Sequence, residues 1–204
     1  WTINRLLGGS QNGDGASIVG FPEGVPMHVR GGAVLLMNAH YLNATTGTLN
    51  PEVAINLWTT PGDQVETEGD ILFLYNPFIS VPANGTGRAH WKCPVHDDIT
   101  IVNAQSHMHK RGVGYAAMVA GEAPFYENDR WAEVPVAQFD GGMQVPAGSE
   151  LEYWCDYDNG EDRVVHQGPR TTDEMCMLIG AYYPADPRTS NCQTADGGLG
   201  GEWI

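Results

Sequence analysis

The chain has 204 residues, of which 42% are hydrophobic, and carries a net charge of −15. This length and apolar content are enough for one large domain with a real core. A chain this acidic repels phosphate groups, which excludes nucleic acid as a partner, and no apolar stretch approaches the roughly 18 residues that a membrane-spanning segment needs.

Short apolar runs, separated by many of the 26 Gly and 13 Pro residues, are the main pattern along the chain. The runs are strand-length, often alternate apolar with polar residues, and are rich in β-branched and aromatic side chains. They occupy residues 33–42, 53–60, 70–81, 98–109, 113–120, 150–158 and 174–183. No segment of 12 or more residues shows the 3.6-residue period of a helix. The sequence therefore predicts an all-β protein, built as an antiparallel, jelly-roll-like β-sandwich.

A polar, acidic stretch over residues 59–70 separates two groups of predicted strands and is the expected domain boundary. We expect residues 1–62 to be the end of an incomplete N-terminal domain and residues 63–204 to form the sandwich. The chain opens on Trp1 rather than Met, which indicates a processed form or a fragment of a longer protein.

Four cysteines, Cys93, Cys155, Cys176 and Cys192, are well separated, and no C-x-x-C pair occurs. The spacing argues against a zinc ribbon and predicts two disulfides. Disulfides persist in oxidising compartments, so we expect a secreted protein, either extracellular or periplasmic. Four cysteines allow three pairings, and spacing alone does not choose among them.

The segment AQSHMHKRG, residues 104–112, places His107 and His109 one residue apart at a strand end. In a β-strand both imidazoles point to the same face, and Met108 points to the other. This arrangement is typical of a metal site, although a polar strand end without metal has the same pattern. Taken singly, His40 and Met175 are typical of core residues.

Together, several segments resemble the copper type II ascorbate-dependent monooxygenases, the family of dopamine β-hydroxylase and peptidylglycine α-hydroxylating monooxygenase. The resemblance spans about residues 20–192, in the family's order, and is carried by FPEGVPMHV, LLMNAHYLN, VPANGTGRAHWKC, IVNAQSHMHKRG, VPAGSELEYWCDYDNGEDR and TTDEMCMLIGAYYP.

The resemblance implies that His107, His109 and Met175 bind one copper, at which dioxygen reacts. It also implies the disulfide pairs Cys155–Cys176 and Cys93–Cys192. His40 matches a histidine of the family's second, electron-relaying copper site. That site also needs a His-His pair, which this sequence lacks. Either the electron-relaying copper is missing, or residues 1–62 are the end of an N-terminal copper domain whose other ligands lie upstream, and we expect the second.

Two positions narrow the expected substrate. Gln105 and Ile179 stand where the peptide-amidating members carry an Arg and a Tyr that bind the substrate carboxylate. We therefore expect a small amine-like substrate rather than a glycine-extended peptide. His166 matches a histidine of some members and is expected to line the substrate pocket.

The implied function is hydroxylation of an aliphatic C–H bond of a small molecule, with dioxygen and ascorbate as co-substrates. The alternative is an extracellular β-sandwich without turnover, in which the metal site is kept as a copper-binding site or the histidines are incidental.

Overall fold

The computed structural model describes residues 5–9, 20–39, 41, 43, 45–196 and 198–199. The elements in chain order are η1 (Gly62–Gln64), β1 (Asp70–Tyr75), β2 (Ser80–Val81), β3 (Gly85–Pro94), β4 (Ile99–Met108), β5 (Gly112–Val119), β6 (Tyr126–Asn128), β7 (Ala137–Val145), β8 (Glu150–Asn159), β9 (Val165–His166), β10 (Cys176–Tyr183) and α1 (Pro187–Ser190). The predicted all-β class is confirmed.

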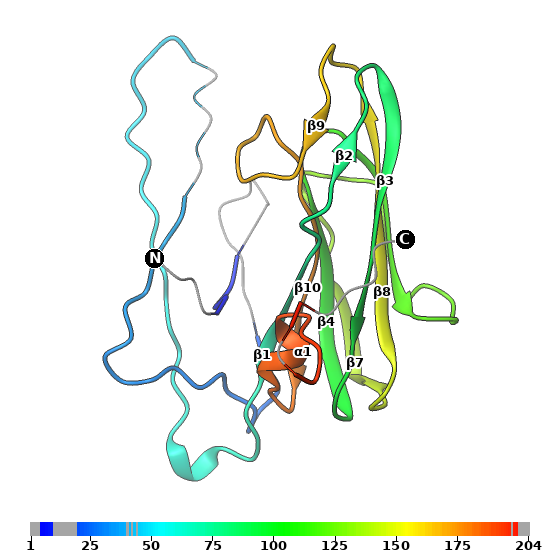
Figure 1. Cartoon of the computed structure of the whole chain (residues 1–204). Helices are drawn as coiled ribbons and strands as arrows, with labels where there is room; N and C mark the ends of the chain where they lie inside the picture. The colour runs from blue at the N-terminus through cyan, green and yellow to red at the C-terminus, as the bar shows by residue number, and fades with distance from the viewer. Residues whose placement is uncertain are drawn as a thin grey trace.

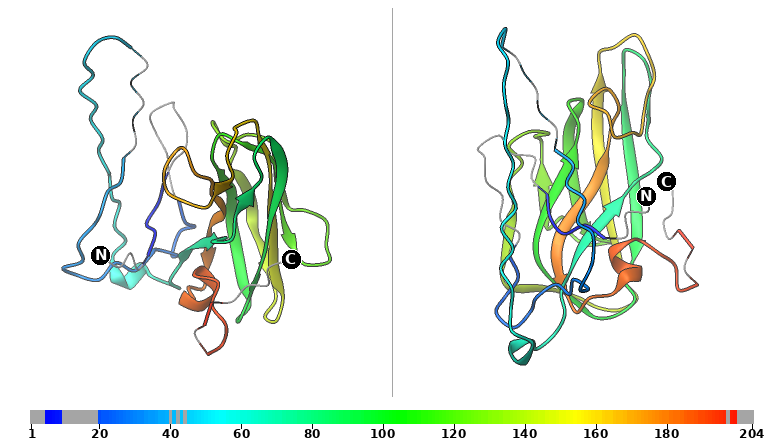
Figure 2. Two further views of the ribbon diagram at one scale, coloured as in Figure 1. Left: turned by 45° about the horizontal axis from the view of Figure 1, so that its top comes forward. Right: turned by 90° about the vertical axis from the view of Figure 1, so that its left-hand side faces the viewer.

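Two four-stranded antiparallel sheets lie face to face (Figures 1 and 2). The first sheet has the strand order β1-β10-β4-β7, and the second has the order β3-β8-β5-β6. The short pair β2-β9 lies at one end of the sandwich. The two long strands that carry most of the predicted site, β4 and β10, are thus neighbours in the first sheet.

The core lies between the sheets and follows from alternation along the strands. In β8, buried residues alternate with partly or fully exposed ones along almost the whole strand. This is the pattern of a strand with one face on a core and the other toward solvent. Trp91, Tyr153 and Tyr157 are the bulkiest fully buried side chains and fill the space between the sheets.

Two disulfides brace the sandwich. Cys155–Cys176 joins β8 of the second sheet to β10 of the first, and Cys93–Cys192 joins β3 to the chain that follows α1. These are the pairs that the resemblance implies.

The strands predicted over residues 33–42 and 53–60 are wrong for the described residues of these segments, which form no strand. A strand needs a hydrogen-bonded neighbour, and between residues 20 and 61 the described chain makes only one β-bridge, from Met27 to Gly69. The segment instead runs out and back as an extended arm beside the sandwich (Figure 1). Many large apolar side chains of the arm, residues 33–60, are exposed, with Val34 and Trp58 each at 82%.

The sequence pattern missed two long strands, β3 and β7. The outward positions of β3 carry Arg88, His90 and Lys92, which weakened its apolar signal. The strand β7 has exposed or half-buried residues at nearly every position and contains Gly141 and Gly142 at positive φ. Both strands are held by their partners in the sheets, β8 and β4, rather than by their own propensity.

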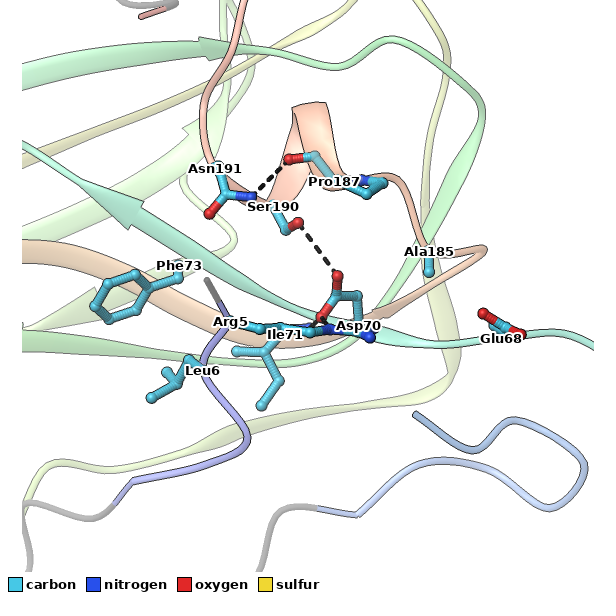
Figure 3. Close-up of a pocket in the computed structure, with 10 residues that line it drawn as sticks. All are labelled: Arg5, Leu6, Glu68, Asp70, Ile71, Phe73, Ala185, Pro187, Ser190 and Asn191. Atoms are coloured by element: carbon cyan, nitrogen blue, oxygen red, sulfur yellow. Dashed lines mark hydrogen bonds and ion pairs between the residues drawn. The ribbon is translucent and has the colours of Figure 1, made fainter. Parts of the chain in front are cut away.

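A cavity of about 200 Å³ lies at the start of β1, and residues that line it attach the first described residues to the sandwich (Figure 3). The Arg5 guanidinium donates through Nε to the Asp70 carboxylate at 2.8 Å, and the Ser190 hydroxyl donates to the other carboxylate oxygen at 3.3 Å. Among the described residues, the predicted copper ligands His107, His109 and Met175 do not line this cavity.

Candidate metal centre

The two histidines of the HMH segment lie side by side at the end of β4. Their ring centroids are 5.4 Å apart, with an angle of 79° between the ring planes. Both side chains are half-buried, whereas Met108 between them is fully buried in the core. Strand alternation therefore places both imidazoles on the outward face of the first sheet, as predicted.

The ring of His109 is fixed by the chain just before β10. Its Nδ1 lies 2.9 Å from the backbone carbonyl oxygen of Asp173. A carbonyl oxygen only accepts, so Nδ1 is the donor, and the neutral ring in this tautomer has its lone pair on Nε2. Metal-binding histidines in proteins are typically oriented by such a bond.

His107 is held in its neutral form. Burial, followed by the neighbouring His109 imidazole, lowers the pKa of His107 to about 4. A neutral imidazole has a lone pair to offer, so at neutral pH this ring needs to lose no proton before it can bind a metal.

Met175 immediately precedes β10. The antiparallel register pairs Met177 with His107 and Cys176 with Met108, and the same register continued by one residue would place Met175 opposite His109. The hydroxyl of Tyr157 donates to the Met175 carbonyl at 2.7 Å, and the next residue, Cys176, is fixed by its disulfide. The half-buried Met175 is thus held at its own carbonyl and at the residue that follows it.

This donor set fits copper(I). Two imidazole nitrogens and a thioether are soft or borderline ligands, which favour Cu(I) over hard cations such as Ca²⁺ or Mg²⁺. In the part of the chain that the structure describes, no three His, Cys, Asp or Glu side chains gather as a site for a harder metal. Three protein ligands would also leave a coordination position open.

The outward face next to the histidines is mainly apolar. Directly opposed residues of neighbouring strands share a face of the sheet. One such row contains Tyr75, Met177 and His107, and the next contains Phe73, Ile179 and Gln105. The structure therefore brings Gln105 and Ile179 together beside the predicted ligands.

The other two histidines of the prediction are not brought to this place. His40 lies outside the described residues. The side chain of His166 is exposed and lines a separate surface hollow of about 370 Å³ with Phe78 and Arg88. His166 reaches the site only through its main chain, where its carbonyl accepts the N–H of Glu174 at 3.0 Å.

Sequence reasoning missed Glu174. Its side chain is fully buried, and one carboxylate oxygen accepts the backbone N–H of His109 at 2.9 Å. The other oxygen accepts the backbone N–H of Arg111 at 3.0 Å. The available signal was an acidic residue immediately before Met175, but with 25 acidic side chains in the sequence no single one stands out.

Residues 73–196 match the family model described as copper type II ascorbate-dependent monooxygenase, C-terminal domain. The match covers more than half of the chain, and the chain belongs to this family. A comparison with curated proteins finds no match.

Proposed function

We propose that this domain is the oxygen-reacting half of a copper monooxygenase, with His107, His109 and Met175 as its metal ligands. The observation that carries the proposal is the pair of imidazoles, 5.4 Å apart, beside the segment that contains Met175. The bond from His109 Nδ1 to Asp173 and the neutral state of His107 leave both rings prepared to donate to a soft metal.

Copper held by these residues would supply the activation of dioxygen: one oxygen atom would enter an aliphatic C–H bond, and the other would leave as water with two electrons from ascorbate and two protons. The chain supplies position and surroundings. His107 and His109 give two nitrogen donors from one strand, and Met175 gives sulfur from the neighbouring segment. The Met177 and Tyr75 side chains lie on the same face of the first sheet as His107. They would form an apolar surface beside the metal and exclude water from the substrate.

The proposed substrate is a small amine-like molecule rather than a glycine-extended peptide. A peptide carboxylate needs a cationic partner, and the rows beside His107 offer an amide and apolar side chains instead. Gln105 and Ile179 face each other across β4 and β10, where they would contact a neutral part of the substrate. The net charge of −15 favours the approach of a cation over that of an anion.

We further propose that residues 1–62 complete an upstream copper domain of the same protein, with His40 as a ligand of its metal. The exposed apolar side chains of the arm support this proposal, including Leu36 at 69% and Leu57 at 62%. Apolar surface on this scale is typical of a segment that a partner covers. Strands of the upstream domain would also form backbone hydrogen bonds with the extended chain of the arm.

The proposed location is secreted, either extracellular or periplasmic, because the two disulfides persist in an oxidising compartment. Across the described residues, no helix has the length and apolar character needed to cross a bilayer.

The test is anaerobic titration of the chain with Cu(I), followed by X-ray absorption at the copper edge. We expect one tightly bound copper with two nitrogen neighbours and one sulfur neighbour. Met175→Ile should remove the sulfur signal and weaken binding, whereas Met118→Ile, a buried methionine of β5, should change neither.

Met177→Ile is the decisive companion variant, because Met177 lies opposite His107 on the same face. Loss of sulfur scattering in this variant alone would show that the ligand is Met177 and that Met175 is misassigned. Absence of stoichiometric copper in the unmodified chain would leave the non-catalytic alternative. Turnover is then tested with the longer protein, as product formation that depends on both ascorbate and dioxygen.

A further inference from the structure

We propose that Glu174 is a positioning residue, whose buried carboxylate sets where the His109 imidazole stands relative to Met175. Glu174 is not a ligand in this scheme and touches no substrate. The inference rests on the proposed copper site for its functional meaning, but the contacts that carry it belong to the chain alone.

Backbone N–H groups just after the end of β4 need hydrogen-bond acceptors. The strand ends at Met108, and the chain turns back so that the Gly112 N–H bonds the His109 carbonyl at 2.9 Å. In such a turn the N–H groups of His109 and Arg111 lose their neighbours in the sheet. Buried backbone donors without partners are costly, so another group must accept from them.

The Glu174 carboxylate fills both needs. Its Oε2 accepts from His109 at 2.9 Å, and its Oε1 accepts from Arg111 at 3.0 Å. Hydrogen bonds to a charged acceptor are roughly twice as strong as neutral ones. A single side chain thereby fixes the backbone on both sides of Lys110.

Glu174 is itself fixed by its main chain. Its N–H donates to the His166 carbonyl, and its carbonyl accepts from the Gly168 N–H, each at 3.0 Å. The buried guanidinium of Arg111 balances the charge, with Nη1 3.3 Å from Glu174 Oε1 and Nη2 bonded to Glu161. An unpaired carboxylate would be costly here, so the paired guanidinium is part of the same arrangement.

Two consecutive residues thus act on His109, and the third is the proposed sulfur ligand. The Asp173 carbonyl orients the His109 ring, the Glu174 carboxylate holds the His109 backbone, and Met175 follows as the proposed sulfur donor. Because all three belong to one short segment, the separation between the imidazole and the thioether depends on the Glu174 bonds.

The test compares Glu174→Gln with Glu161→Gln. The amide has only one acceptor oxygen, so in Glu174→Gln an NH₂ group faces one of the backbone donors. Loss of outer partners of this kind typically lowers metal affinity by about 10- to 100-fold. We expect a loss in this range, and a weaker copper–sulfur signal, for Glu174→Gln. Glu161→Gln removes an Arg111 partner that does not contact His109, and affinity should stay within about 2-fold of the unmodified chain.

Glu174→Asp separates charge from reach. It keeps the carboxylate, but the side chain is one methylene shorter, so the two oxygens do not reach the N–H groups of His109 and Arg111. If position is what matters, Glu174→Asp should lose Cu(I) affinity as Glu174→Gln does. Full affinity and an unchanged sulfur signal in a folded Glu174→Gln would overturn the proposal.

Two measurements on the metal-free chain keep this test separate from that of the copper site. The NMR chemical shifts of the His109 ring nitrogens should show a proton on Nδ1. In Glu174→Gln the same shifts should show a mixture of the two imidazole tautomers. The amides of His109 and Arg111 should exchange slowly with solvent in the unmodified chain. Fast exchange at both would overturn the inference even if no variant folds, whereas failure of the chain to bind Cu(I) would overturn only the proposed function.

Discussion

Cys155 and Cys176 join the two sheets immediately beside the proposed sulfur ligand. Cys155 lies in β8, Cys176 begins β10, and their Cα atoms are 5.8 Å apart. Because Met175 precedes Cys176, this bridge limits how far the main chain at Met175 can move relative to β8. The Cys93–Cys192 bridge lies elsewhere, between β3 and the chain after α1.

Replacing the two disulfides separately should give different results. In the chain-entropy model, a bridge with a sequence separation of 21 contributes about 3 kcal/mol and one with a separation of 99 contributes about 4.7 kcal/mol. We expect the Cys93→Ala/Cys192→Ala chain to lose more free energy of unfolding. The Cys155→Ala/Cys176→Ala chain should lose more Cu(I) affinity, and the opposite order in either measurement would contradict this assignment.

Alkaline pH should destabilise the fold through its buried phenols. Burial raises the pKa of Tyr182 to about 12, against an ordinary value of 10.0. The folded state thus favours the protonated phenol, and this stability is complete below pH 10 and lost as pH rises through about 12. At about 1.4 kcal/mol per pH unit the loss amounts to roughly 3 kcal/mol. Urea unfolding from pH 9 to 12 measures it, and Tyr182→Phe should reduce the slope.

The Arg5–Asp70 pair should stabilise the attachment of the N-terminal residues. Arg5→Ala removes the guanidinium and leaves the buried carboxylate with only its Ser190 and Ile71 donors. The expected loss is about 1–3 kcal/mol in free energy of unfolding. In a double-mutant cycle, Asp70→Asn should lose much less in the Arg5→Ala background than alone. Fully additive losses would show that the pair is not coupled.

Gly180 should not tolerate a side chain. A Cβ at this position of β10 would clash with the backbone oxygen of Asn103, where the pairing of β10 with β4 is irregular. Gly180→Ala should therefore destabilise the sandwich by about 1–3 kcal/mol. Gly87→Ala in β3, where the nearest atom would lie 3.5 Å away, is the matched control and should have little effect. Equal thermal midpoints for the two variants would contradict this reading of the packing.

The sequence predicted the fold class because β1, β4, β8 and β10 are apolar runs of strand length, and β8 alternates clearly between buried and more exposed residues. Of these strands, β4 and β10 are the inner strands of the first sheet, and β8 is an inner strand of the second. It failed where a strand depends on its neighbours. The polar strand β7 is paired with β4, whereas the apolar segment at residues 53–60 has no neighbouring strand and forms none in the structure. Apolar content alone therefore does not determine pairing.

For the site, the facing of His107 and His109 followed from strand alternation, and Met175 entered only through resemblance. The role of Glu174 could not be predicted, because it depends on a turn after β4 meeting a segment 63 to 65 residues away in the sequence. No local pattern reports that a carboxylate is buried or which backbone donors it meets.

The alternation of β4 and β10 has a consequence for how the protein matures. Along β4, His107 and His109 flank the core residue Met108, and Met175 likewise precedes the core residue Cys176. A slip of one residue in strand pairing would turn both imidazoles into the core and expose Met108. Such a chain would lose its packing together with the proposed metal site, so folded protein that lacks the outward histidine pair should not accumulate. Quality control that recognises exposed core residues would therefore also select for chains that keep the proposed copper ligands on one face.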